Sequence, residues 1–178
     1  MLNHLQERIL RLFFDLPESD GFALAGGGAL VVREVVCRTT RDLDLFTTVG
    51  REVRLAAEAL QARLLALGLQ SRVIRSGPSF VRLVVGAGRG EEVVVDLAAD
   101  TRLMPPEAGP LGPVLTLDDL AADKLLALFG RAEARDFVDV WALAKMLGTQ
   151  RLLDLARAKD PGFDTYVLAT MIGTLGRH

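Results

Sequence analysis

The predicted fold depends on two short stretches, Leu24-Ala-Gly-Gly-Gly-Ala-Leu30 and Arg38-Thr-Thr-Arg-Asp-Leu-Asp-Leu-Phe46. The first stretch begins within the apolar run of residues 22–25, which predicts a short buried strand, and a helix is predicted over residues 29–36. Because glycine has no Cβ, a phosphate can approach the backbone closely at this turn, and the free N–H groups of a helix start favour an anion. The glycines therefore predict a phosphate-binding turn.

The second stretch presents two carboxylates on one face of a predicted strand. Residues 42–46 alternate polar and apolar side chains, which is the period of a strand. Asp42 and Asp44 therefore point the same way, with Leu43 and Leu45 on the other face. Two carboxylates held together repel unless a cation lies between them, and Mg²⁺ binds through one or two carboxylates plus substrate phosphates. The strand therefore predicts a magnesium site.

A third carboxylate, Asp96, ends the apolar run Val93-Val-Val. Three acids could hold two metal ions, one activating an attacking hydroxyl and one bridging nucleotide phosphates. Taken singly, each feature has a plainer explanation: an Asp-x-Asp on a solvated strand, a glycine turn without a ligand, or an Asp96 paired with an arginine. Their order, with fitting secondary structure, favours function over coincidence.

Periodicity predicts the remaining elements. Helices are expected over residues 2–14, 51–67, 116–129, 135–147, 150–158 and 165–175, and strands over residues 70–75, 80–85 and 92–97. Closely spaced strands indicate an antiparallel or mixed sheet, so the predicted fold class is α+β. A Pro/Gly-rich stretch, residues 105–113, separates an α/β core at 1–104 from a helical part at 114–178, and we expect the two to pack as one compact unit. Trp141 is expected in the core, and Cys37 is expected to pack as a small hydrophobe.

Composition bounds the class of protein. The chain of 178 residues fits one compact domain, and its 50% hydrophobic content allows a sizeable core. Charges interrupt every apolar run before about 18 residues, which argues against a membrane-spanning helix. No secretory signal is expected, and one cysteine excludes an internal disulfide, as suits the cytoplasm. One cysteine and two histidines argue against a zinc site.

The net charge of −2 gives no overall attraction to nucleic acid. Residues 33–102, however, contain 11 basic and 9 acidic residues. That region could present an arginine-lined face, although an ordinary solvated surface explains the same count.

The glycine turn, the Asp-x-Asp strand and the later acid resemble the polymerase β-type nucleotidyltransferase pattern. More narrowly, residues 22–147 resemble the AbiEii/AbiGii-type toxin nucleotidyltransferases of bacterial abortive-infection and toxin–antitoxin systems. The family's Arg-x-Ser/Thr-x-Asp-x-Asp is matched by Arg38, Thr40, Asp42 and Asp44, and its later Lys and Arg-Asp-x-x-Asp by Lys124, Arg135, Asp136 and Asp139. The family often has Ser or Thr where this chain has Gly28, so a hydroxyl that could bind phosphate is missing.

The resemblance implies a polymerase β-like core, a mixed sheet flanked by helices, with further C-terminal helices. It implies Mg²⁺-dependent transfer of a nucleoside monophosphate from an NTP to an acceptor hydroxyl, with a tRNA 3′ end as possible acceptor and an antitoxin as possible partner. The implied roles are metal binding by Asp42, Asp44 and Asp96, general-base action by Asp96, phosphate or nucleotide binding by Gly26, Gly27, Gly28, Arg38 and Thr40, and neutralisation of phosphate charge by Lys124.

Lys124 has competing interpretations. It lies in an apolar helical run, where a lysine could contact triphosphate oxygens or simply extend its ammonium to solvent. Asp136 and Asp139 lie three residues apart on one helix face. They could orient Lys124 or Arg131, contact an acceptor, or form a solvated face.

Two alternatives to the toxin enzyme remain open. One is a catalytically inactive member of the fold that acts as a binding module. The other keeps the enzyme but changes the acceptor to a small molecule or to a side chain of a partner protein. A small enclosed pocket would favour the small acceptor, and an open basic groove would favour nucleic acid.

Overall fold

The structure, a computed structural model, describes residues 1–88 and 90–174, and of Arg51 and Thr174 only the backbone. The chain divides into two compact units. The first comprises residues 1–101 and 106–115, and the second comprises residues 102–105 and those from 116 onward. That the α/β core and the helical part pack as one unit stays a prediction.

The first unit contains a mixed seven-stranded sheet in the order β3-β4-β5-β2-β1-β7-β6. Its strands are β1 (Ala23–Ala25), β2 (Asp42–Thr47), β3 (Gln70–Gly77), β4 (Phe80–Gly86), β5 (Glu92–Ala99), β6 (Glu107–Gly109) and β7 (Gly112–Val114). The β2–β5 and β1–β7 pairs are parallel, and the other pairs are antiparallel. The predicted α+β class with a mixed sheet is confirmed.

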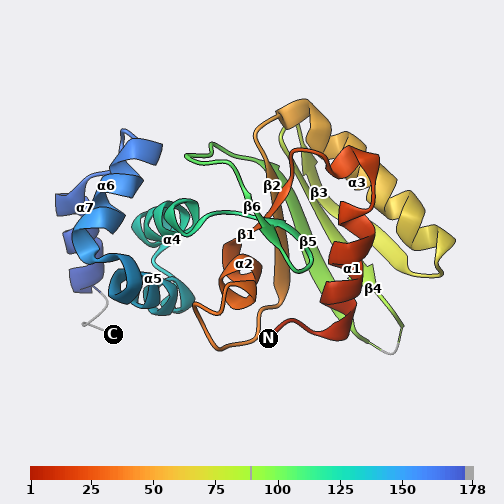
Figure 1. The fold of residues 1–178 in the computed structure, drawn as a ribbon, viewed down its shortest axis with the longest axis horizontal. Coiled ribbons are helices and arrows are strands. Elements are labelled where there is room, and N and C mark those ends of the chain that lie inside the picture. The colour runs from red at the N-terminus through yellow and green to blue at the C-terminus, as the bar shows by residue number, and fades with distance from the viewer. Residues whose placement is uncertain (89, 175–178) are drawn as a thin grey trace. The chain divides into compact units, whose positions relative to one another are not determined.

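Three helices accompany this sheet: α1 (His4–Phe14), α2 (Gly26–Val32) and α3 (Gly50–Ala66). Helices α1 and α3 lie along one face of the sheet (Figure 1). Leu43 and Leu45 of β2 are fully buried, whereas Asp42 and Asp44 are only partly buried. Because side chains alternate along a strand, the apolar face of β2 is the covered one and both carboxylates lie on the other face.

Helix α2 begins earlier than expected. It starts at Gly26 and ends at Val32, whereas the sequence predicted residues 29–36. The glycines themselves form the first helical turn, which the low helix propensity of glycine conceals. After α2 the chain reverses at Glu34, whose φ of 58° is left-handed, so the helix cannot continue to residue 36.

The Pro/Gly-rich stretch is part of the sheet and not a plain connection. It forms the β6–β7 hairpin, and β7 adds in parallel to β1, with Val114 opposite Leu24. The tight approach of the hairpin turn to α1 requires a glycine. A Cβ on Gly112, whose φ is +128°, would lie 2.2 Å from the ring of Phe14.

The second unit is helical, with α4 (Leu117–Arg131), α5 (Ala134–Leu147), α6 (Thr149–Lys159) and α7 (Thr165–Thr174). Thr116 caps α4, because its hydroxyl accepts a hydrogen bond from the Asp119 N–H at 3.2 Å. Helix α4 contacts each of the other three helices. The predicted end of the last helix, Leu175, lies outside the described residues.

Two packing predictions are wrong. Trp141 is 62% exposed, and the Lys145 Nζ lies 3.7 Å from the centre of its ring. The buried line of α5 is instead formed by Asp136, Asp139 and Leu143, because cations within the same unit neutralise the two acids. Cys37 is exposed, since it lies in the loop between α2 and β2.

Candidate active site

The three predicted carboxylates lie on two neighbouring parallel strands. Asp44 of β2 is directly opposite Asp96 of β5, and Asp42 is opposite Val94 in the same ladder. Residues opposite each other in a ladder share a face, and neighbouring strands lie about 4.8 Å apart. The fold therefore brings Asp42, Asp44 and Asp96 together on one face, although Asp44 and Asp96 are 52 positions apart in the sequence.

The glycine turn lies against Asp44. Gly26 follows Ala25, the residue of β1 opposite Asp44, and has a left-handed φ of +55°. A Cβ at this position would lie 1.9 Å from Asp44 Oδ2. Only glycine leaves room for both the backbone turn and the carboxylate.

Arg38 and Thr40 lie beside the next glycine. A Cβ on Gly27 would lie 3.1 Å from Arg38 Nη2 and 3.2 Å from Thr40 Oγ1. The Thr40 hydroxyl donates to the Asp42 carbonyl at 3.2 Å, and the buried Gln6 of α1 donates to the Thr40 carbonyl at 3.0 Å. The local sequence pattern around the glycines does not reveal Gln6, because its contact links residues 34 positions apart.

Gly28 faces the apolar core. A Cβ there would lie 3.2 Å from Leu24 Cδ1 and 3.7 Å from Leu43 Cδ2. A serine or threonine side chain at this position would therefore start toward leucines. Without that hydroxyl, the groups that remain to bind a phosphate are the backbone N–H groups of the first turn of α2. These groups lack intrahelical partners, as at any helix start.

Gly26→Ala is expected to lower the free energy of unfolding by about 3 kcal/mol and to displace Asp44. The added Cβ combines a left-handed backbone penalty of about 1–2 kcal/mol with overpacking against a carboxylate. Thermal or urea unfolding measures the loss.

Gly68→Ala is the matched control for that substitution. Gly68 has a similar φ of +72°, but a Cβ there would have no neighbour within 4 Å. It should therefore lose only the backbone penalty of about 1 kcal/mol. Equal losses in the two variants would contradict the proposed contact between Gly26 and Asp44.

Arg82 of β4 holds Asp96 with a two-pronged ion pair. Its Nε donates to Asp96 Oδ1 at 2.7 Å and its Nη2 donates to Oδ2 at 2.6 Å. These hydrogen bonds raise the pKa of Arg82 above its usual value against the lowering effect of partial burial, and the charges of Asp96, Asp42 and Asp44 raise it further. Sequence reasoning missed Arg82. The feature of the sequence that could have revealed Arg82 is that it is a single charged residue inside the apolar run of residues 80–85.

The donor set of this face fits Mg²⁺. Carboxylate oxygens on one sheet face are the ligands that Mg²⁺ prefers, and it uses only one or two of them besides water and phosphates. Within residues 1–88 and 90–174, however, no three histidine, cysteine or acidic side chains are gathered in a form that could hold a metal ion. Both carboxylate oxygens of Asp96 accept hydrogen bonds from Arg82.

Arginines extend the row of charges beyond Asp96. Arg75 of β3 lies opposite Arg82, which lies opposite Asp96, so the row continues across four strands to Asp44. The guanidinium carbons of Arg75 and Arg82 each lie 5.7 Å from the centre of the Phe80 ring. Arg72, nearby on β3, is 61% exposed. One sheet face thus carries acids and, beside them, exposed arginines.

Lys124 lies in the second unit within a buried ionic cluster. Its Nζ is 2.9 Å from Asp139 Oδ2 and 3.8 Å from Asp136 Oδ1, and both carboxylates are fully buried. Arg131 also pairs with Asp136, at 2.9 and 3.1 Å. The interpretation that the two acids orient Lys124 and Arg131 is confirmed, and the solvated-face interpretation is wrong. A role of Lys124 at the phosphates stays a prediction.

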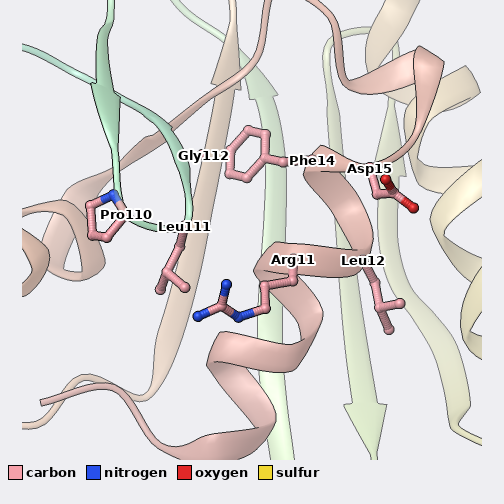
Figure 2. A pocket seen from close by; sticks show the side chains of 7 residues that line it. All are labelled: Arg11, Leu12, Phe14, Asp15, Pro110, Leu111 and Gly112. Carbon is pink, nitrogen blue, oxygen red and sulfur yellow. The ribbon is translucent and has the colours of Figure 1, made fainter.

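A separate hollow of about 430 Å³ lies between the end of α1 and the β6–β7 turn. Figure 2 shows Phe14 directed toward Gly112, with Arg11 and Leu111 below them. None of the seven residues that line the hollow is a predicted site residue.

The sequence matches the family described as nucleotidyl transferase AbiEii toxin, type IV TA system, over residues 8–170. The chain belongs to the AbiEii nucleotidyltransferase toxin family. No curated protein matches the sequence. Among the described residues, no helix combines the length and apolar character that crossing a membrane requires.

Three solved structures illustrate the likeness in fold. MenT4, a nucleotidyltransferase toxin of Mycobacterium tuberculosis, has a TM-score of 0.64 and 21% identity, covering 83% of this chain and 59% of its own. JHP933 of Helicobacter pylori has a TM-score of 0.62 and 17% identity, covering 99% and 92%. The antibiotic-resistance factor ANT(2″)-Ia has a TM-score of 0.61 and 16% identity, covering 98% of both chains. The likeness confirms the polymerase β-like fold of this AbiEii-family protein.

Proposed function

We propose that this AbiEii-family protein transfers a nucleoside monophosphate from an NTP to an acceptor hydroxyl in a Mg²⁺-dependent reaction. The observation that carries the proposal is the pairing of Asp44 with Asp96 in one ladder, beside a glycine turn that leaves room for the Asp44 carboxylate. Mg²⁺ held by these acids would supply positive charge that stabilises the negative charge developing during transfer.

The chain's own residues have distinct roles in the proposed reaction. Asp42, Asp44 and Asp96 would hold the metal, and Asp96 would also take the proton from the acceptor hydroxyl. The acceptor oxygen then bonds to the α-phosphorus, and the bond to the departing pyrophosphate breaks. The N–H groups of Gly26, Gly27 and Gly28 bind phosphate oxygens, with Arg38 and Thr40 beside them and Lys124 as a further phosphate contact.

The acceptor that we propose is an RNA end such as a tRNA 3′ end, with the protein acting as a toxin held in check by an antitoxin. Family membership in a type IV toxin–antitoxin system supports the antitoxin. The exposed arginines beside the acids support a polyanionic acceptor, because phosphate contacts from arginine dominate nucleic-acid affinity. The ring of Phe80, near Arg75 and Arg82, could stack on a base.

One observation favours a second candidate, a binding module that has lost catalysis. Arg82 donates hydrogen bonds to both oxygens of Asp96. If this ion pair never broke, Asp96 could not bind the metal, and the site would lack its third metal ligand. A measurement of NTP binding distinguishes the binding module from the enzyme.

The test is a thermal-shift titration with each of the four NTPs, with and without Mg²⁺. We expect one NTP at millimolar concentration to raise the melting temperature only when Mg²⁺ is present, since ligand binding to the folded state stabilises it. Asp42→Asn should lose the shift because a neutral amide is a weaker metal ligand.

The pattern of shifts decides between the candidates. A shift that needs both Mg²⁺ and Asp42 supports the enzyme and identifies its nucleotide. No shift with any NTP would favour the binding module. An equal shift in Asp42→Asn would contradict the proposed metal site.

A further inference from the structure

The Arg82–Asp96 pair is in direct conflict with metal binding at Asp96. Each oxygen of Asp96 accepts a hydrogen bond of 2.7 Å or less from the same guanidinium. The Asp96 side chain is 10% exposed, so little of its surface remains open to other ligands. A cation that binds to Asp96 must therefore share its oxygens with Arg82 or displace it.

The side chain of Arg82 can move more readily than that of Asp96. Its side chain is 45% exposed, whereas Asp96 is held on a central strand between β2 and β4. The ring of Phe80 also lies within reach of the guanidinium, at 5.7 Å, and offers it a second contact. Arg82 can thus leave Asp96 without entering bulk solvent completely.

The charges on this face explain why an arginine lies there. Asp44 and Asp96 are opposite each other, and Asp42 lies two residues along the same strand. Carboxylates that share one sheet face repel one another unless positive charge lies among them. The guanidinium of Arg82 supplies a positive charge at Asp96.

We propose that Arg82 is a positioning residue that acts as an internal counter-cation: it holds Asp96 in the metal-free protein and competes with the divalent metal for that carboxylate. Arg82 thereby sets the metal affinity of the site. This inference rests on the proposed metal-dependent function, and its test measures metal binding and not turnover.

The experiment is a titration of Mn²⁺, which prefers the same oxygen ligands as Mg²⁺, with free Mn²⁺ followed by electron paramagnetic resonance in the absence of NTP. Arg82→Met removes the guanidinium and keeps an unbranched side chain. We expect it to bind Mn²⁺ about tenfold more tightly, the low end of what a hydrogen bond to a charged group contributes. If Arg82 had only a structural role, its replacement would weaken metal binding.

Arg75→Met is the matched control, because Arg75 lies opposite Arg82 on the same face and contacts the same ring. It removes a nearby positive charge but no bond to Asp96, so it should change Mn²⁺ affinity by about twofold or less after solvent screening. Arg82→Lys keeps the charge without the two-pronged geometry and should fall between the wild type and Arg82→Met. This variant also tests the inference if Arg82→Met does not fold.

Adding Asp96→Asn to Arg82→Met should cancel the gain, because the gain depends on the freed carboxylate. Equal or weaker Mn²⁺ binding in both Arg82 variants would overturn this inference and leave the proposed function standing. No Mn²⁺ binding by the wild type or by either Arg82 variant would also overturn this inference, and the thermal-shift titration with NTP and Mg²⁺ tests the proposed function separately.

Discussion

Asp44→Asn is expected to lower the rate of nucleotide transfer by about 10³-fold, the scale at which electrostatic contacts to a reacting centre contribute. Asp44 has the central position among the acids, opposite Asp96 in the ladder and against the turn at Gly26. Asparagine keeps the shape of the side chain and removes its charge. Transfer of a labelled nucleoside monophosphate to RNA, followed against time, measures the loss.

The same substitution should not destabilise the metal-free protein. Asparagine has nearly the same volume as aspartate, so the melting temperature without metal should change by no more than a few degrees. Glu92→Gln is the control, since Glu92 is also on β5 but its exposed side chain pairs with Arg72, at 3.4 Å. Wild-type transfer by Asp44→Asn, or an equal loss in Glu92→Gln, would remove Asp44 from the proposed site.

Lys124→Met is expected to destabilise the protein by about 3 kcal/mol, because it leaves buried acids without the ammonium that neutralises them. Asp136 and Asp139 are both fully buried, and Asp139 lies 2.9 Å from the Lys124 Nζ. For a chain of this length that corresponds to a drop of about 8 °C in melting temperature. Thermal unfolding by circular dichroism checks it.

Two further variants separate the buried cluster from a phosphate contact. Lys145→Met removes a lysine from the exposed side of α5, where its Nζ lies over Trp141, and should cost less than about 1 kcal/mol. Lys124→Met with Asp139→Asn should recover part of the lost stability, because the uncompensated charge is gone. If Lys124→Met melts like the wild type, the buried pairs do not fix Lys124, and its predicted role at the phosphates gains support.

The local parts of the fold follow from the sequence. Strand β2 and helix α3 were predicted to within one residue at each end, because alternation and helical spacing are strong in both. The prediction of buried residues failed where the buried side chains are ion-paired acids and not apolar residues. On α5 the buried line contains Asp136 and Asp139, so a search for apolar periodicity placed Trp141 inside. A pattern of hydrophobicity does not reveal that a lysine from another helix neutralises buried acids.

The sequence by itself determined that Asp42 and Asp44 point the same way and that a glycine turn precedes them, because both follow from spacing along one strand or turn. Only the tertiary structure decided that Asp96 lies beside Asp44, that Arg82 holds Asp96, and that Lys124 is enclosed by acids of α5. The physical reason is that strand order, ladder register and helix packing join residues far apart in the chain. Their contacts are set by the whole hydrogen-bonded sheet and the packed helices, and not by the spacing of neighbours.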